Sequence, residues 1–308
     1  MKIYMNSPNE SWIVDRFNRE IRSYSKENFT SNIKNADLVW IVAPWTWSSL
    51  NKNYLQQKKV ICTVHHLEFD NKGMKDYEDF INLDNYVDFY HVISQKTYDQ
   101  LIKFTSKKIF LIPFWVNQNL FYPIEDKLSL RKKYKFNFED YLVGSFQRDS
   151  EGSDLSKPKL IKGPDRFIEI VFQLKQKNNN LKVLLTGPRR NYIINELNQR
   201  EIQFTYFRRA NQKKLNELYN ILNLYIVSSR IEGAPQAILE AAASKTPVIS
   251  TNVGIADKIL STKSIYQMSN FESAEADVDY AYENVKKYFI PEWYKQFFSL
   301  FEKLINEN

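Results

Sequence analysis

The sequence predicts an α/β protein made of two successive domains, each built around a parallel sheet. Short apolar runs alternate with segments of helical spacing along the chain, which is typical of βαβ units. A second series of this kind follows a connector, so the boundary is expected near residues 120–135. The 308 residues are also too many for one ordinary core and suit two domains of ordinary size.

The first series forms the N-terminal domain, which we assign to residues 1–125. Apolar runs predict its strands, and apolar residues that recur at spacings of three and four predict its helices. The expected strands lie at 2–5, 36–44, 59–64, 87–94 and 107–114, and the expected helices lie at 13–24, 48–57 and 95–104. Because strands and helices alternate, a parallel sheet is expected here.

The second series forms the C-terminal domain, which we assign to residues 126–287. Its expected strands lie at 141–146, 181–187, 224–230 and 247–251, and its expected helices lie at 164–177, 211–222 and 235–244. The strand at 181–187 is closed by Gly187. The same alternation predicts a second parallel sheet.

The last segment, 288–308, predicts an amphipathic helix with a wide apolar stripe. The stripe consists of Ile290, Trp293, Phe297, Leu300, Phe301 and Leu304. Such a stripe needs a surface to cover, and both a membrane surface and a protein domain would serve. We expect packing on a domain, and we assign this helix to the N-terminal domain.

Composition narrows the class of protein. Hydrophobic residues make up 43% of the chain, and no apolar run approaches the length of a membrane-spanning helix. The N-terminus lacks the apolar run of a signal peptide, and the single cysteine, Cys62, fits a reducing compartment. A cytoplasmic protein is therefore expected, with the inner face of a membrane as an alternative location.

The net charge of +7 favours anionic partners, such as nucleotide phosphates, membrane surfaces or nucleic acids. The basic residues are scattered along the chain rather than gathered in one run. Charge alone therefore selects no partner, because a solvated surface rich in lysine explains it as well.

The most informative segment runs from Ser228 to Ala243 and reads SSRIEGAPQAILEAAA. It predicts the end of a strand, a sharp turn at Gly233 and Pro235, and then a helix. In a parallel sheet such a turn lies at the carboxyl ends of the strands, where ligands bind. The first helix amides would form a site for phosphate or another anion, and they belong to Ala234, Gln236 and Ala237.

Two glutamates lie in this segment. Glu232 stands at the turn and can accept hydrogen bonds from ligand hydroxyls, and Glu240 lies inside the helix, within reach of a second set of hydroxyls. A structural interpretation is also open. In that case Glu232 complements the helix dipole and Glu240 is an exposed helix residue.

Two cations, Arg148 and Lys162, bracket a strand-to-helix junction of the same domain. Because the carboxyl ends of parallel strands meet at one edge of the sheet, we expect this pair at the edge that carries Glu232. Cations together with hydroxyl-accepting carboxylates suit a ligand that has both a diphosphate and sugars. Two solvated surface cations are the alternative.

These motifs resemble those of retaining GT-B glycosyltransferases of the family 4 type, the glycosyl transferases of group 1. The pattern Ser-Arg-x-Glu-Gly-x-Pro, followed by Glu-Ala-x-Ala and Pro-Val-Ile, is similar to the glutamate pair of that family. The segment GSFQRD…KPKLIKGPDRF resembles its phosphate-binding element with an enlarged loop, and IPFWVNQNLFYP resembles its interdomain stretch. The resemblance is specific over 144–255 and weaker, although in order, over 37–124.

The resemblance implies two Rossmann-like domains that face a central cleft, with the final helix crossing back to the N-terminal domain. Arg148 and Lys162 would hold the donor diphosphate. Glu232 would bind the hydroxyls of the transferred sugar, and Glu240 would bind those of the ribose. The segment Thr205–Arg208 would follow a strand and border the nucleotide base. The further donor-binding candidates are Gly187, Tyr206, Phe207, Arg208, Gly233, Ala234 and Pro235.

In the N-terminal domain the resemblance implies a histidine near the 6-position of the sugar. His65 and His66 follow the strand at 59–64, and we favour His66, with structural hydrogen bonding by the pair as the alternative. Adjacent histidines without a third ligand do not predict a metal site. The glycine-rich first loop of the family, which contacts a phosphate, is replaced here by residues 6–9. Ser7 is our candidate site residue in this loop.

A second departure from the family lies just after the helix that contains Glu240. The family has a glycine there, and this chain has Lys245. We therefore expect Lys245 in a left-handed conformation, at a cost on the order of 1 kcal/mol relative to glycine.

The resemblance implies a transferase that moves a sugar from a nucleotide-diphosphate donor to an acceptor hydroxyl with retention, as in polysaccharide biosynthesis. It implies no metal and no other cofactor, because cationic side chains and helix amides would stabilise the leaving diphosphate. The acceptor would be a glycan, a lipid-linked molecule or a small molecule, with peripheral membrane contact as an option and no nucleic acid. The alternatives are an epimerase of the same architecture and a non-catalytic protein that binds nucleotide sugars or glycans.

Overall fold

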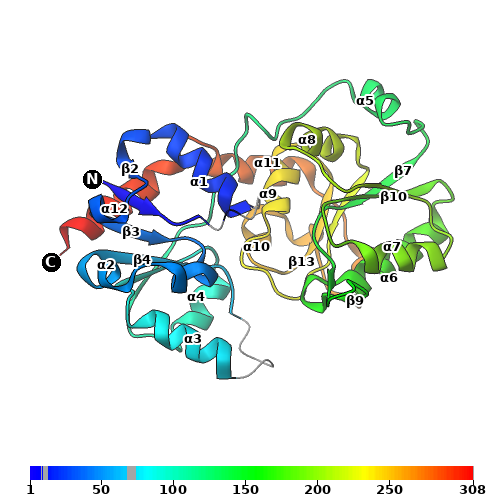
Figure 1. Cartoon of the computed structure of the whole chain (residues 1–308). Coiled ribbons are helices and arrows are strands. Elements are labelled where there is room, and N and C mark those ends of the chain that lie inside the picture. Colours follow the sequence, from blue (N-terminus) through cyan, green and yellow to red (C-terminus); the bar gives the residue numbers. More distant parts are fainter. Residues whose placement is uncertain (8, 10–12, 68–73, 308) are drawn as a thin grey trace. The chain divides into compact units, whose positions relative to one another are not determined.

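The computed structural model describes residues 1–7, 9, 13–67 and 74–307. The chain forms two compact units (Figure 1). Unit 1 consists of Met1–Phe114 together with the segment that begins at Pro291, and unit 2 consists of Trp115–Ile290. Within the described residues, each unit is built around a six-stranded parallel sheet, which confirms the predicted α/β class.

The sheet of unit 1 has the strand order β2-β1-β3-β4-β5-β6, and all neighbouring strands are parallel. Its strands are β1 (Ile3–Met5), β2 (Phe29–Thr30), β3 (Leu38–Ile41), β4 (Lys59–Val64), β5 (Phe89–Val92) and β6 (Lys108–Leu111). β3 is buried along its whole length, and its run of apolar residues is typical of a sheet covered on both faces. The strand order reverses between β1 and β3, so the carboxyl ends of these two strands form the switch point of unit 1.

The final helix packs on unit 1. The helices described in this unit are α1 (Ile13–Tyr24), α2 (Lys52–Gln57), α3 (Met74–Asp84), α4 (Gln95–Leu101) and α12 (Tyr294–Asn306), with 3-10 helices η1 (Lys26–Asn28), η2 (Ile33–Asn35) and η3 (Pro44–Ser49). In α12, Phe297, Leu300, Phe301 and Leu304 are buried. The rings of Phe297 and Phe301 lie against Trp40 of β3, at centroid distances of 5.6 and 5.1 Å. The final helix therefore crosses back to unit 1 as expected, and four residues of the predicted stripe cover that domain. The helix begins at Tyr294 rather than at 288, so Ile290 and Trp293 precede it.

The sheet of unit 2 has the strand order β11-β10-β7-β12-β13-β14, again with parallel neighbours. Its strands are β7 (Tyr141–Ser145), β10 (Leu181–Thr186), β11 (Phe204–Phe207), β12 (Leu224–Val227), β13 (Val248–Thr251) and β14 (Ile265–Tyr266). Counted within this unit the order is that of dinucleotide-binding sheets, with the switch point between β7 and β12. A ligand site is therefore expected outside the carboxyl ends of β7 and β12.

Helices cover both faces of this sheet, with α6 and α7 on one face and α8, α9 and α11 on the other (Figure 1). The helices described in unit 2 are α5 (Lys127–Lys133), α6 (Pro164–Lys177), α7 (Asn191–Gln199), α8 (Gln212–Ile221), α9 (Gln236–Ala243), α10 (Ala256–Ile259) and α11 (Val278–Val285). The 3-10 helices are η4 (Leu160–Lys162), η5 (Thr262–Ser264), η6 (Phe271–Ser273) and η7 (Lys286–Tyr288). The enlarged loop after β7 forms a small hairpin of β8 (Ser150–Glu151) and β9 (Lys157–Pro158).

The sequence of α6 explains how this helix is fixed on the sheet. Phe167, Ile170 and Val171 recur at spacings of three and four, so they lie on one face of the helix. All three are buried in one cluster with Val143 of β7 and Leu185 of β10. Burial of each such side chain contributes roughly 1.5–3 kcal/mol. This packing holds the start of α6 at the carboxyl edge of the sheet, next to the switch point.

The units divide at Phe114 and at Ile290, whereas we expected boundaries at 125 and 288. Val116 forms an isolated parallel bridge with Phe289, and Gln118 Oε1 accepts a hydrogen bond from the backbone N–H of Ile290 at 3.1 Å. These contacts hold the stretch after Phe114 on unit 2. The connector therefore belongs to the second unit, because it pairs with the other end of that unit.

Candidate functional site

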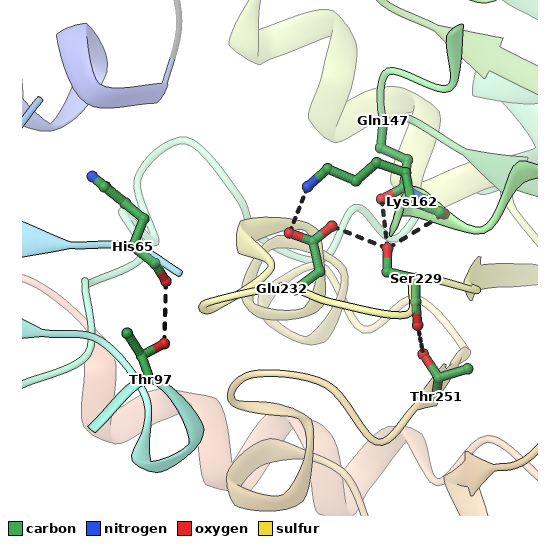
Figure 2. A network of polar contacts seen from close by, with 7 residues as sticks. All are labelled: His65, Thr97, Gln147, Lys162, Ser229, Glu232 and Thr251. Carbon is green, nitrogen blue, oxygen red and sulfur yellow. Dashed lines mark hydrogen bonds and ion pairs between the residues drawn. The ribbon is translucent and has the colours of Figure 1, made fainter. Parts of the chain in front are cut away.

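The candidate site lies at the switch point of unit 2, outside the carboxyl ends of β7 and β12. The loop after β7 carries Gln147 and Arg148, and the loop after β12 carries Ser229 and Glu232. The turn η4 brings Lys162 to the same edge. In Figure 2 the side chains of Gln147, Lys162, Ser229 and Glu232 converge there.

A hydrogen-bonded network joins these side chains (Figure 2). Lys162 Nζ lies 2.6 Å from Glu232 Oε2, and the two side chains are 20% and 11% exposed. Ser229 Oγ donates to Glu232 Oε1 at 3.0 Å, and Gln147 Nε2 donates to the carbonyl oxygen of Lys162 at 2.9 Å. Thr251 Oγ1 in turn donates to the carbonyl oxygen of Ser229 at 2.6 Å. The carboxylate and the ammonium are therefore held in fixed orientations close to the surface.

Lys162 owes its position to close contact between its own turn and the loop after β12. The carbonyl oxygen of Ile161 accepts the N–H of Arg230 at 2.8 Å, and Ser228 Oγ donates to the carbonyl oxygen of Gly163 at 2.8 Å. Gly163 has a φ of 62°, and a Cβ at this position would lie 1.9 Å from the carbonyl oxygen of Ser228. Glycine is therefore required here for both its conformation and its lack of a side chain.

Gly163→Ala is expected to lower the free energy of unfolding by about 3 kcal/mol, because the added Cβ must displace the backbone at Ser228. Gly187→Ala is the matched control. Gly187 also has a positive φ, of 86°, but a Cβ there meets nothing within 4 Å, so only the conformational cost of about 1 kcal/mol remains. Urea unfolding of both variants, followed by circular dichroism, measures the difference. Equal losses would show that the contact with Ser228 is unimportant.

Both residues of the predicted cationic pair lie at this edge of the sheet, but their side chains differ in solvent exposure. Lys162 is mostly buried in its contact with Glu232, whereas Arg148 is exposed. Gln147, the residue before Arg148, bonds to the backbone of Lys162, so the two cations lie on loops that contact each other. The alternative of two unrelated surface cations therefore does not describe Lys162.

Arg190 is a site residue that our sequence analysis did not single out. Its guanidinium is fully buried, with Nε 2.5 Å from Asp149 Oδ2, and Nη1 donates to the carbonyl oxygens of Gln147 and Thr186. Burial raises the pKa of the Asp149 carboxyl, and the charge of Arg190 opposes that effect. The ion pair fastens the loop that carries Arg148 to the end of β10. The sequence does contain one signal that could have identified Arg190, because this residue comes just after a predicted strand of the same sheet.

Glu240 lies inside α9 and is 5% exposed, so the interpretation as an exposed helix residue is wrong. Tyr219 Oη of α8 donates to Glu240 Oε2 at 3.0 Å. The ring of Tyr219 is itself buried between Phe146 and Tyr225. A buried carboxylate that already has a hydroxyl partner is an oriented acceptor for the hydroxyls of a ligand.

The turn before α9 is tightly packed. Gly233 and Pro235 are buried, and Ala234 between them is partly exposed. Gly254 has a φ of 52°, and a Cβ on it would lie 2.3 Å from the carbonyl oxygen of Gly233. The loop after β13 can therefore support this turn only if Gly254 is glycine, which our sequence analysis did not predict. As in any α-helix, the first amides of α9 lack carbonyl partners inside the helix.

The candidates for the nucleotide base lie within β11 and at its end, rather than after a strand as expected. Tyr206 Oη donates to the carbonyl oxygen of Gly187 at 2.8 Å, which joins two of the candidates. The ring of Phe207 carries the ammonium of Lys214 over one face, 3.7 Å from the ring centroid. That face of the Phe207 ring is therefore covered by Lys214. Arg208, which comes just after the strand, is exposed.

The expected left-handed conformation of Lys245 is confirmed, with a φ of 51°. Its N–H donates to the carbonyl oxygen of Ala242 at 3.1 Å, which closes the end of α9. The turn therefore keeps its shape with lysine in place of glycine.

In unit 1 the loop after β1 is held by side-chain contacts at the switch point. Asn6 Nδ2 donates to Thr46 Oγ1 at 2.8 Å, and Ser7 Oγ donates to Asp15 Oδ1 at 2.6 Å. Pro8 of this loop lies outside the described residues. The carboxylate of Asp15 beside Ser7 weighs against a phosphate contact at Ser7, because the two negative charges would repel.

The two adjacent histidines have different surroundings. His65 Nε2 donates to the carbonyl oxygen of Val42 at 2.8 Å, and the carbonyl oxygen of His65 accepts from Thr97 Oγ1 at 3.2 Å (Figure 2). Burial lowers the pKa of His65 to about 4, so its ring is neutral at pH 7. His66 is exposed. His65 thus fits the structural interpretation, and His66, the residue we favoured, is the more accessible of the two.

Within the described part of the chain, no group of three His, Cys, Asp or Glu side chains is placed to hold a metal ion. Nor is any helix among the described residues long and apolar enough to cross a membrane. Cys62 is buried in β4, and burial raises the pKa of its thiol far above the ordinary value.

Comparison with known proteins gives one family match, over residues 158–288, to the family described as "Glycosyl transferases group 1". The matched region contains Lys162, Glu232 and Glu240, and Arg148 precedes it. No curated protein sequence matches this chain.

Several solved structures share the fold over nearly the whole chain. HepE from Anabaena, in complex with UDP-glucose, is 12% identical, covers 98% of this chain and 99% of that chain, and has a TM-score of 0.72. Sucrose-phosphate synthase from Thermosynechococcus elongatus is 16% identical, covers 98% and 81% of the two chains, and has a TM-score of 0.70. A glycosyltransferase from Rickettsia africae is 18% identical, covers 99% and 85%, and has a TM-score of 0.63. The likeness establishes the fold, which is of the GT-B type.

Proposed function

We propose that this protein, whose residues 158–288 match the family of glycosyl transferases group 1, transfers a sugar from a nucleotide-diphosphate donor to an acceptor hydroxyl. The observation that carries the proposal is the Lys162–Glu232 pair at the switch point of unit 2. The ammonium offers a cation for the diphosphate, and the carboxylate offers acceptors for sugar hydroxyls. HepE, which has the same fold, is a complex with UDP-glucose, and this supports a nucleotide sugar as the ligand.

The donor would lie along the carboxyl edge of the unit 2 sheet. We place its diphosphate at Lys162, Arg148 and the first amides of α9, which together provide positive charge and N–H donors. The transferred sugar then meets Glu232, and the ribose meets Glu240. The exposed end of β11 would border the base.

The proposed reaction breaks the bond between the anomeric carbon of the sugar and the diphosphate oxygen, and forms a bond to the acceptor oxygen. The transition state has oxocarbenium character, and negative charge grows on the leaving diphosphate. Lys162, Arg148 and the helix amides stabilise that charge most when the bond breaks. The leaving phosphate oxygen takes the proton of the acceptor hydroxyl, so the acceptor arrives on the same face and the configuration is retained. These groups provide the required charge without a divalent metal ion.

The acceptor we propose is a glycan, a lipid-linked saccharide or a small molecule with a free hydroxyl. The exposed His66 of unit 1 would act near the transferred sugar. We place the reaction in the cytoplasm, at the inner face of a membrane if the acceptor is lipid-linked.

A panel of nucleotide sugars and nucleoside diphosphates tests the proposal by thermal shift. A ligand that binds only the native state stabilises it, by about 2.7 kcal/mol at 100 times its dissociation constant. We expect at least one nucleotide sugar and its matching diphosphate to raise the melting temperature. This nucleotide sugar is then labelled and incubated with the protein. We expect slow hydrolysis without an acceptor and faster consumption when an acceptor is added. Failure of every nucleotide to stabilise the protein would refute the proposal, and binding without turnover would favour a non-catalytic binding protein.

A further inference from the structure

Tyr219 and Glu240 form a buried hydrogen bond between α8 and α9. Tyr219 is 1% exposed and Glu240 is 5% exposed, and Tyr219 Oη lies 3.0 Å from Glu240 Oε2. A carboxylate removed from water needs hydrogen-bond donors to replace the lost hydration. The hydroxyl of Tyr219 is one such donor, so it influences both the cost of burying Glu240 and the orientation of its carboxylate.

The ring of Tyr219 is held in one position by its neighbours. Its centroid lies 4.9 Å from that of Phe146, 5.2 Å from that of Tyr225 and 6.1 Å from that of Phe121. Thr246 Oγ1 also donates to the carbonyl oxygen of Tyr219 at 2.9 Å, which fixes the backbone. Since the ring cannot move, the hydroxyl stays where it is. The carboxylate of Glu240 must therefore adopt the orientation that meets it.

This fixed orientation matters for a ligand with two adjacent hydroxyls, such as a ribose. A carboxylate has about four lone-pair positions, and the bond from Tyr219 uses one of them. It can accept from both hydroxyls of a ribose only if its plane is turned toward them. A side chain that is already oriented binds more tightly than one that must be ordered during binding.

We propose that Tyr219 is a positioning residue for ribose recognition, acting through its hydrogen bond to Glu240. The inference rests on the proposed function, because it takes Glu240 as the partner of the ribose. It goes further by assigning the preference for ribonucleotides to a residue outside the family motif. Tyr219 touches the carboxylate and not the nucleotide, so its loss affects ribose recognition and leaves the contacts of the diphosphate and the base in place.

The test compares binding of a nucleoside diphosphate with that of its 2′,3′-dideoxy analogue, which lacks both ribose hydroxyls. Isothermal titration with UDP, GDP, ADP and CDP first identifies the diphosphate that binds most tightly to the wild-type protein. We expect the wild-type protein to prefer this diphosphate over its dideoxy analogue by about 100-fold. In Tyr219→Phe, which keeps the ring and removes only the hydroxyl, the preference should fall to about tenfold, through weaker binding of the ribonucleotide alone.

Tyr266→Phe is the matched control. Tyr266 is also a buried tyrosine of unit 2, but its hydroxyl donates to the carbonyl oxygen of Val227 at 3.0 Å. Its loss also removes a hydrogen bond to a buried acceptor, so it reproduces the general effect on stability, and the ribose preference should stay at the wild-type value. Circular dichroism confirms that both variants are folded at the temperature of the titration.

The outcomes separate the inference from the proposed function. If Tyr219→Phe weakens both ligands equally, or keeps the full ribose preference, the positioning role is wrong and the proposed function stands. If the wild-type protein binds both ligands equally well, Glu240 does not recognise the ribose and the inference fails with that assignment. If no nucleoside diphosphate binds at all, the proposed function itself is overturned, and the inference falls with it.

Discussion

Replacing Lys162 with methionine is expected to lower turnover of the nucleotide sugar by about 100- to 1,000-fold, the usual effect of removing one group that stabilises charge in a transition state. Methionine keeps most of the apolar stem and removes only the cation. The ammonium lies 2.6 Å from Glu232, at the edge where the diphosphate is proposed to leave. Its charge is most valuable when the bond breaks, so kcat should fall more than binding of the donor.

Steady-state kinetics with the donor found in the nucleotide panel measures this effect. Lys177→Met is the control, because Lys177 is an exposed lysine at the end of α6 whose partner, Glu272, is equally exposed. Its turnover should remain at the wild-type value. Lys162→Met also leaves Glu232 without its cation, so circular dichroism must show that the variant is folded. A folded Lys162→Met protein with wild-type turnover would disprove the assignment of Lys162.

Arg190→Met is expected to lower the free energy of unfolding by about 3–5 kcal/mol, which is the largest loss of stability that we predict. Arg190 and Asp149 are 0% and 1% exposed, and they are joined by an ion pair of 2.5 Å. Removing the cation leaves the Asp149 carboxylate buried without a counter-charge, although it keeps the hydrogen bond from Ser150 Oγ. Breaking a buried pair from one side is far more costly than losing an exposed one.

Two further variants test whether the loss of stability in Arg190→Met comes from the charge that is left buried. Arg200→Met breaks a much more accessible pair with Glu196 on α7, whose side chains are 35% and 20% exposed, and should cost no more than about 0.5 kcal/mol. The double replacement of Arg190 by methionine and Asp149 by leucine should regain much of the stability, because no charge is then left buried. Urea unfolding gives all these values. A loss below about 1 kcal/mol in Arg190→Met would mean that water or other groups compensate for the missing cation.

Most strands of both sheets could be predicted because parallel strands are buried on both faces and appear as apolar runs. β4 and β12, for example, are buried over most or all of their lengths. β11 was missed, and its four residues are only partly buried. The helices α3, α5, α7, α10 and α11 were not predicted. They are short or polar, so their stability comes from tertiary packing rather than from a strong pattern, as in the contact of α11 with α9. The two-residue strands β2 and β14 are too short to give a pattern at all.

The chemistry of the candidate site could be predicted in part, because a parallel sheet gathers the loops after its strands at one edge. This rule places Lys162 and Glu232 together although they are 70 residues apart in the chain. It does not say which side chains pair below the surface. The bond of Tyr219 to Glu240 and the burial of Arg190 depend on how α8 and the loop after β10 pack, and neither is encoded in residue spacing.

The same limit applies to individual residues whose neighbours come from distant segments. The need for glycine at position 254 arises from the carbonyl oxygen of Gly233, which only the folded turn brings near. His65 and His66 are adjacent in the sequence, and only the structure distinguishes the ring that is bonded to Val42 from the ring that is exposed.

The packing of α12 on unit 1 also determines the order in which the protein can be completed during translation. Unit 2 is a continuous stretch, Trp115–Ile290, inserted between the two parts of unit 1. Trp40 of β3 precedes unit 2 in the chain, yet its partners Phe297 and Phe301 are synthesised only after the whole of unit 2. Domains generally fold as units during synthesis. Unit 2 can therefore fold first, and the core of unit 1 keeps an incomplete apolar surface until α12 has been synthesised.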